Sequence, residues 1–198
     1  MFRFTGSYCL LWLITSLQLV AQSTQIHYLC GTDKENPAQW DFLIDKGRKS
    51  GSWQKNNVPS CWEMEGFGEY SFGSLPFNEK AVYQYQFIAL PSWQGKHINL
   101  VFEGMLTDTK VKLNRQTIGI SGYMRFSFNV SAALKYSTSN EREVVVNKRS
   151  TEPFNVSAPM WLFGGTYKPV YLEILPEKHI TYLAVETQAI TLFMKIGE

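Results

Sequence analysis

Hydrophobic and polar residues alternate with a period of two along much of the chain. Trp40, Phe42 and Ile44 share one face of an extended segment whose opposite face carries Asp41 and Asp45, as expected of a half-buried strand. The same alternation, or a short apolar run, recurs at 83–87, 98–102, 111–118, 126–130 and 144–146. Turn signals separate these segments every 8–12 residues or so, and no segment keeps a helical period. The pattern therefore predicts an all-β fold of the sandwich type.

Two motifs rich in glycine and aromatic residues punctuate this pattern, VPSCWEMEGFG at 58–68 and WLFGGTYKPVYLE at 161–173. Each predicts a turn that leads into a strand. Pro59 has no N–H for a central ladder, and the glycine pair 164–165 can kink the chain. Residues 66–80 contain four glycine or proline breaks and predict a long surface loop, the kind of segment that often carries function.

Composition narrows the class of protein. A chain of 198 residues predicts one domain, with room for an appendage. Hydrophobic residues make up 44% and aromatic residues 15%, which suffices for a full core. With 19 basic and 17 acidic residues the net charge is +2, and no basic cluster or stripe is present. These features argue against a nucleic-acid-binding protein.

The first 23 residues are typical of an export signal. Arg3 gives a short positive region, residues 9–20 are mostly apolar, and small residues offer cleavage after Ala21 or Ser23. The apolar run is shorter than the roughly 20 residues that a membrane span requires. We therefore expect a signal peptide at 1–23 and an exported protein, periplasmic or extracellular, with no membrane segment after cleavage.

Cleavage would leave two cysteines, Cys30 and Cys61. A disulfide between them would close a loop of about 30 residues and contribute on the order of 3–4 kcal/mol. The alternative is two unpaired thiols, which we favour because two cysteines form neither a metal spacing nor a disulfide framework. The three histidines at 27, 97 and 179 are too scattered for a metal site, so no metal or cofactor is expected.

The two motifs and a third, LVFEGMLTDTKVKLN at 100–114, resemble in order and spacing the N-terminal sugar-binding domain of glycoside hydrolase family 2. The resemblance covers roughly residues 28–186 and is greatest to the secreted bacterial β-galactosidase-type members. It implies that the sandwich is a jelly roll. The parent activity that it implies is the retaining hydrolysis of terminal β-galactosides or related β-glycosides, without an organic cofactor.

The resemblance also implies a domain division, with the sugar-binding-type sandwich at 24–178 and the start of an immunoglobulin-like β-sandwich at 179–198. Two strands cannot form such a domain, because a lone hairpin is marginal in water. In the family, the two catalytic glutamates lie in a later barrel domain. The chain is thus expected to be truncated before that barrel and to have no hydrolase activity alone.

Two positions depart from the family pattern. An acid that contacts sugar is typical two residues before the tryptophan that matches Trp161, and Pro159 occupies this position. Arg115 follows Asn114 where the family usually has Asn-Gly, and a residue with a side chain strains a primed hairpin turn. The first departure removes a sugar contact while the surrounding scaffold motif remains.

The residues themselves offer no catalytic constellation. Retaining glycosidases use two carboxyls about 5–5.5 Å apart, and Glu63 and Glu65 could point the same way on a strand. We expect instead that they are solvent-facing acids, because nothing nearby suggests a pocket that would raise one pKa. Sugar stacking on aromatic rings is a better candidate, with core packing as the alternative for every ring. The candidate rings near presumed loop ends are Trp62, Tyr70, Phe72, Tyr123 and Trp161.

Three functions are consistent with these observations. The first is a non-catalytic sugar-binding or scaffold domain of a β-galactosidase-type enzyme, with the missing catalytic barrel as its partner. The second is a self-standing carbohydrate-binding module that takes a β-galactoside-type sugar. The third is a structural or partner-binding β-sandwich with a large exposed apolar patch.

Overall fold

The computed structural model describes residues 23–72, 78–122, 124–148, 161–186 and 191–197. Tyr123 and Pro159 lie outside these ranges, as does the predicted signal peptide except for its last residue, Ser23. Within them, no helix is long and apolar enough to cross a membrane. The single helical element among the described residues is a short 3₁₀ turn, η1 (Pro91–Trp93).

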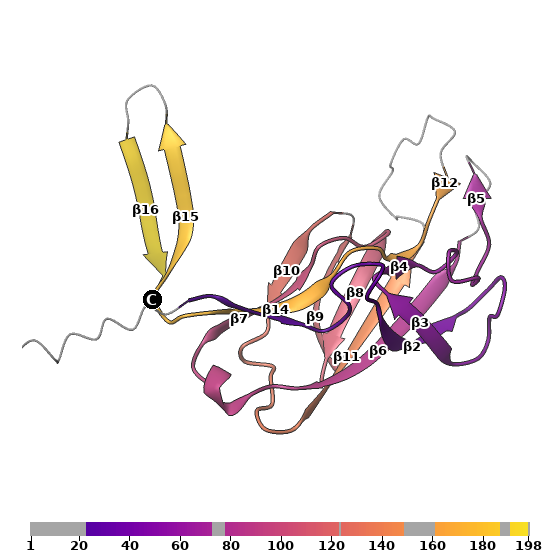
Figure 1. The fold of residues 1–198 in the computed structure, drawn as a ribbon, viewed down its shortest axis with the longest axis horizontal. Helices are drawn as coiled ribbons and strands as arrows, with labels where there is room; N and C mark the ends of the chain where they lie inside the picture. Colours follow the sequence, from indigo (N-terminus) through magenta and orange to yellow (C-terminus); the bar gives the residue numbers. More distant parts are fainter. Residues whose placement is uncertain (1–22, 73–77, 123, 149–160, 187–190, 198) are drawn as a thin grey trace, which may run out of the picture.

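Two antiparallel sheets form the body of the molecule (Figure 1). The first has the order β1-β14-β7-β10, with bounds β1 (Gln25–Tyr28), β14 (Val170–Leu175), β7 (His97–Phe102) and β10 (Phe126–Asn129). The second has the order β3-β2-β6-β11-β8-β9, with bounds β3 (Gln54–Val58), β2 (Ala38–Ile44), β6 (Lys80–Ile88), β11 (Ser139–Asn147), β8 (Asp108–Leu113) and β9 (Gln116–Gly122). The chain crosses between the sheets from β6 to β7, from β7 to β8 and from β9 to β11 through β10. The predicted all-β sandwich is confirmed.

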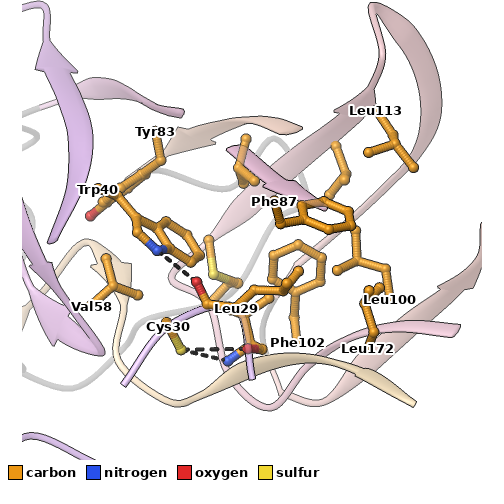
Figure 2. Packing of buried hydrophobic residues seen from close by; sticks show 14 of the residues in the cluster. Leu29, Cys30, Trp40, Val58, Tyr83, Phe87, Leu100, Phe102, Leu113 and Leu172 are labelled. Atoms are coloured by element: carbon orange, nitrogen blue, oxygen red, sulfur yellow. Dashed lines mark hydrogen bonds between the residues drawn. The ribbon is translucent and has the colours of Figure 1, made fainter. Parts of the chain in front are cut away.

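The core lies between the sheets because alternate residues of both sheets point inward. Trp40, Phe42 and Ile44 of β2 are fully buried, as their alternation predicts. Leu100 and Phe102 of β7 meet them from the other sheet. Figure 2 shows this packing, in which the Trp40 indole nitrogen donates a hydrogen bond to the Leu29 carbonyl at 2.9 Å.

β11 is longer and more polar than its apolar run suggests. It begins at Ser139, and it pairs with β6 along nine residues and with β8 along six. Arg142 belongs to its inward face and is fully buried, with its guanidinium carbon 3.7 Å from the centre of the Trp40 ring. Burial lowers the pKa of this guanidinium. Its nitrogen atoms have no hydrogen-bond partner among the described residues, so the Trp40 ring is its main compensation.

Two short ribbons bring the glycine-rich motifs together at one end of the sandwich. β4 (Ser60–Cys61) pairs with β13 (Gly165–Thr166), and β5 (Ser71–Phe72) pairs with β12 (Trp161–Leu162). Segments about 100 residues apart in sequence therefore lie side by side. The same end of the molecule contains the loop predicted at 66–80, of which residues 66–72 and 78–80 are described.

A separate hairpin follows β14. β15 (His179–Glu186) pairs with β16 (Thr191–Gly197), and Figure 1 shows the two strands projecting away from the sandwich. The His179 ring lies 5.3 Å from the His97 ring at the base of this projection. Ile180 and Leu183 are more than half exposed. The division of the chain at 178 and 179 coincides with the start of this hairpin and remains a prediction.

The hairpin between β8 and β9 turns at Asn114 and Arg115, with φ of 51° and 69°. Both residues are in the left-handed region, as a primed two-residue turn requires. Asn114 is held there because its side chain donates to the Ala133 carbonyl and accepts from the Glu141 N–H. Arg115 is exposed and has no such compensation among the described residues, so its conformation is the strained one.

We expect Arg115→Gly to raise the free energy of unfolding by about 0.5–1 kcal/mol, because glycine adopts a positive φ without steric cost. Urea unfolding followed by tryptophan fluorescence would measure this change. Asn114→Gly is the matched control, since it relieves the same backbone conformation but removes the side-chain hydrogen bonds. It should therefore destabilise the protein. Equal effects of the two substitutions would contradict this account.

Candidate functional site

The two motifs meet at Trp62 and Gly164. Trp62 is fully buried, and its backbone N–H donates to the Gly164 carbonyl at 3.0 Å. A Cβ atom on Gly164 would overlap the six-membered ring of Trp62, so only glycine permits this approach. The contact fixes the end of the sandwich at which β4, β5, β12 and β13 converge.

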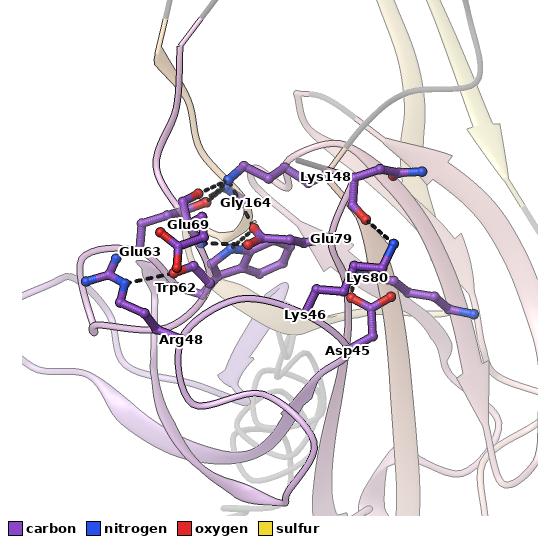
Figure 3. A network of polar contacts seen from close by, with 12 residues as sticks. Asp45, Lys46, Arg48, Trp62, Glu63, Glu69, Glu79, Lys80, Lys148 and Gly164 are labelled. Atoms are coloured by element: carbon purple, nitrogen blue, oxygen red, sulfur yellow. Dashed lines mark hydrogen bonds and ion pairs between the residues drawn. The ribbon is translucent and has the colours of Figure 1, made fainter. Parts of the chain in front are cut away.

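Next to Trp62, three charged side chains are almost completely buried together. Lys148 places its Nζ 2.7 Å from Glu63 Oε1 and 3.1 Å from Glu79 Oε2. Each side chain is at most 1% exposed. Figure 3 shows these residues converging from separate segments of the chain. We call this group the buried charge cluster.

Backbone and indole donors complete the buried charge cluster. The Gly164 N–H donates to both carboxylate oxygens of Glu63 at 3.0 and 3.1 Å. Glu79 accepts from the Glu69 N–H at 2.6 Å and from the Trp62 indole at 3.3 Å. Lys148 Nζ also donates to the Glu69 carbonyl at 2.5 Å. Every member is thus satisfied, which a desolvated polar network requires.

Burial is the main influence on the pKa of Glu63 and on the pKa of Cys61. It raises the pKa of Glu63, while Lys148 and the Gly164 N–H oppose the shift. Burial also raises the pKa of the neighbouring Cys61 thiol to about 11, and the negative charge of Glu63 adds to this effect. The Cys61 thiol is therefore protonated at neutral pH and is a poor nucleophile.

The expectation that Glu63 faces solvent is wrong. The turn that follows β4 directs Glu63 inward, where Gly164 and Lys148 compensate its charge. Glu65 is half-buried and accepts a hydrogen bond from the Asn57 side-chain amide at 2.9 Å. Sequence reasoning missed Glu79 and Lys148 altogether. The only available signal was that each lies in a short polar stretch beside a predicted strand, which is too common to single them out.

The buried charge cluster is not arranged as a glycosidase acid pair. A retaining enzyme needs one carboxyl as proton donor and another as nucleophile, both within reach of the sugar. Glu63 and Glu79 are covered by the chain, and both are held by the same lysine. This geometry joins segments of the fold and leaves neither carboxylate exposed to a substrate.

The surface beside the buried charge cluster contains an exposed aromatic ring. Tyr70 is 44% exposed, and its hydroxyl donates to the Glu63 backbone carbonyl at 3.2 Å. The Arg48 guanidinium lies 5.2 Å from the centre of the Tyr70 ring, and Phe163 approaches the ring edge-on at 6.4 Å. Tyr70 therefore presents part of its ring to solvent in a fixed orientation.

The five candidate sugar-binding rings have different positions. Trp62 is a core residue with no exposed face, so core packing, the alternative considered for it, describes its role. Tyr70 is accessible. Trp161 and Phe72 are paired residues of β12 and β5, but their side chains lie outside the described part, as does Tyr123. Tyr70 is thus the one candidate that the described structure places on the surface.

Cys30 and Cys61 are unpaired in the structure. The Cys30 sulfur accepts a hydrogen bond from the Val170 N–H at 3.0 Å and lies in the core between the sheets (Figure 2). Cys61 lies in β4, next to Trp62. Within the described residues, no group of three or more histidine, cysteine or acidic side chains could hold a metal ion.

Comparison with known proteins relates the chain to large glycosidases. It is 28% identical over 164 residues to a β-galactosidase of Pseudoalteromonas haloplanktis, which covers 75% of this chain and 16% of that enzyme. It is 26% identical over 166 residues to a β-glucuronidase of Bacteroides fragilis, covering 79% of this chain and 23% of that enzyme. A β-galactosidase of Thermoanaerobacter pseudethanolicus is 33% identical over 120 residues, or 58% of this chain. No protein-family model matches the chain.

Solved structures show the same fold. A Bacteroides uniformis β-glucuronidase superposes with a TM-score of 0.61 at 23% identity, over 80% of this chain and 19% of that protein. A β-glucuronidase described as a member of glycoside hydrolase family 2 gives a TM-score of 0.61 at 18% identity, over 85% of this chain and 21% of that protein. At these identities the likeness establishes the fold.

Taken together, the fold and these relatives define a β-sandwich domain of the kind found in large glycosidases. The chain is similar over most of its length to β-galactosidases and β-glucuronidases, and this likeness is consistent with an N-terminal domain of glycoside hydrolase family 2. The resemblance found in the three motifs is thereby confirmed. The chain spans between about a sixth and a quarter of the length of the curated relatives it matches.

We expect Lys148→Met to lower the free energy of unfolding by about 3–5 kcal/mol, because it leaves two buried carboxylates without their cation. Lys112→Met is the matched control. Lys112 pairs with Glu143 at a similar distance of 2.7 Å but at a partly exposed site, so its loss should cost less than about 1 kcal/mol. Urea titration of both variants would measure the difference. Comparable losses would show that burial does not govern the Lys148 contacts.

Glu63→Gln tests the raised pKa of Glu63. Between the ordinary pKa of 4.5 and the raised value, the folded protein retains a proton that the unfolded chain has lost. Stability therefore falls as pH rises through this window. The unfolding free energy of the wild type should decline relative to Glu63→Gln, with a slope of at most about 1.4 kcal/mol per pH unit. A constant difference between the two proteins across acidic and neutral pH would exclude the raised pKa.

Proposed function

We propose that the chain is a non-catalytic β-sandwich domain of a β-galactosidase- or β-glucuronidase-type glycosidase, and that it supports a catalytic domain and shapes the approach to its substrate. The observation that carries this proposal is the match between most of this chain and less than a quarter of each relative. The matched part includes the two sheets of the sandwich, whereas most of the length of those enzymes lies elsewhere.

The chemistry of the described residues supports the same conclusion. Glu63 and Glu79 are two carboxylates that share one partner, Lys148. Both are buried, and Lys148 compensates their charge. A glycosidic bond cannot reach them. In this proposal the acid and the nucleophile of the parent reaction are supplied by the catalytic domain, and this chain supplies a rigid wall with Tyr70 at its surface.

The partners that follow from this function are a β-glycoside and the catalytic domain of the parent enzyme. The relatives are named for β-galactoside and β-glucuronide hydrolysis, and we propose that the parent of this chain acts on a sugar of one of these kinds. We also propose that the protein is exported, on the basis of the signal-like residues 1–23.

A self-standing carbohydrate-binding module is the second candidate. The observation that favours it is the exposed ring of Tyr70, which is held in place by the Glu63 carbonyl and the Arg48 guanidinium. Such a module would bind sugar without any contribution from a catalytic domain.

Two measurements separate these functions. The purified chain should show no turnover of chromogenic β-galactosides and β-glucuronides, and measurable turnover would overturn the non-catalytic assignment. An antibody raised against the chain should detect a polypeptide several times longer than 198 residues in cells of the source organism. Detection of a product of about 198 residues alone would favour the self-standing module.

A further inference from the structure

Arg48 is held against the segment that carries Tyr70 by three hydrogen bonds. Its backbone exchanges two bonds with Gly68, and its Nε donates to the Gly68 carbonyl at 2.9 Å. The guanidinium then lies 5.2 Å from the centre of the Tyr70 ring. Figure 3 shows Arg48 extending beside the buried charge cluster. The side chain is therefore oriented before any ligand arrives.

The neighbouring Lys49 has a similar arrangement. Its Nζ lies 4.7 Å from the centre of the Phe67 ring and donates to the Glu65 carbonyl at 3.3 Å. Two adjacent cations on one turn thus each lie over an aromatic ring of the facing segment. Such contacts keep a cation in place without neutralising its charge.

The segments that carry Arg48 and Tyr70 pack directly against members of the buried charge cluster. Gly47 and Gly68 approach the Glu79 carboxylate so closely that a Cβ atom on either would lie under 3.0 Å from its oxygen. The Tyr70 hydroxyl is bound to the Glu63 backbone carbonyl. The turn carrying Arg48 and the segment carrying Tyr70 are thereby packed on one support, which lowers the entropic cost of binding.

Arg48 and Lys49 differ in charge balance from three other surface cations of the sandwich, which form ion pairs. Lys55, Lys112 and Arg125 each lie within 3.1 Å of a carboxylate oxygen. Among the described residues, neither Arg48 nor Lys49 has an acidic partner within 4.0 Å. Two oriented positive charges therefore remain available to an anion from solvent.

We propose that Arg48, Lys49 and Tyr70 form a binding site for an acidic sugar, a glycan unit that carries a carboxylate. This inference rests on the proposed role of the chain in carbohydrate recognition and specifies the class of sugar. The guanidinium edge of Arg48 binds the carboxylate through two parallel N–H donors, and Lys49 adds a second charge. The exposed part of the Tyr70 ring contacts the C–H groups of the sugar ring.

The test compares methyl β-glucuronide with methyl β-glucoside, which differs from it in lacking the carboxylate. Titration of each into the purified full chain, followed by NMR or calorimetry, should show the glucuronide binding about tenfold or more tightly. Added salt should weaken the glucuronide complex selectively, because the charges are at the surface. Equal affinity for the two glycosides would overturn the assignment to acidic sugars.

Three variants locate the site. Arg48→Met and Lys49→Met should each weaken glucuronide binding by about fivefold or more, and Arg48→Lys should recover only part of the Arg48→Met loss because it lacks the planar fork. Lys110→Met, which removes an exposed cation from β8, is the matched control and should bind like the wild type. Thermal unfolding of each variant verifies folding, and Lys49→Met retains the Arg48 contacts if Arg48→Met fails to fold. Unchanged binding in Lys49→Met and Arg48→Lys would overturn the site.

The outcomes also separate this inference from the proposed function. If both glycosides bind equally and Tyr70→Ala abolishes binding, carbohydrate recognition stands and the acidic preference is wrong. If neither glycoside binds, the site is wrong, while the assignment as a non-catalytic glycosidase domain still depends on the turnover and antibody measurements.

Discussion

The desolvated contact between Lys148 and the carboxylates of Glu63 and Glu79 is the interaction on which this end of the molecule depends. Taking three charges out of water costs several kcal/mol for each ion. That cost is offset only when the chain supplies every remaining donor, and here Trp62, Glu69 and Gly164 do so. The contact therefore specifies one arrangement of several loops, whatever its net contribution to stability. A slip of any one segment would leave a buried charge without its partner.

This requirement explains why the two glycine-rich motifs are so similar in character. Gly164 must lack a side chain to approach Trp62, and its N–H must also reach Glu63. Gly68 is constrained by the Glu79 carboxylate in the same way. Glycine at these positions serves close packing around buried charge more than it serves turn formation. The surface that carries Tyr70 and Arg48 is rigid because it is built on this packing.

The sequence predicted the sandwich well because alternation along a strand directly reports a buried and an exposed face, as at Trp40, Phe42 and Ile44. The pairing of the two motifs through β4 with β13 and β5 with β12 could not be predicted, since no local pattern relates residues 100 positions apart. Sequence reasoning failed for Glu63, because an acid beside a turn is ordinarily solvated and its buried partner, Lys148, is distant in the sequence. It also missed the inward face of Arg142, which interrupts an otherwise apolar pattern. Glu63 and Arg142 are buried because each contacts a residue that is distant in the sequence, Lys148 and Trp40 respectively. Such a contact cannot be predicted from either residue alone.

Arg142 has a consequence for how the core can change over generations. Its guanidinium, lacking a hydrogen-bond partner among the described residues, lies against the face of Trp40. A smaller or less electron-rich residue at position 40 would leave the buried cation with only the more distant rings of Tyr85 and Phe102, 5.7 and 6.0 Å away, which costs far more than the lost apolar area. Conversely, once position 142 is apolar, no buried cation requires an aromatic ring at position 40. The two sites are therefore coupled, and the sandwich can pass from one core to another only by steps that begin at position 142.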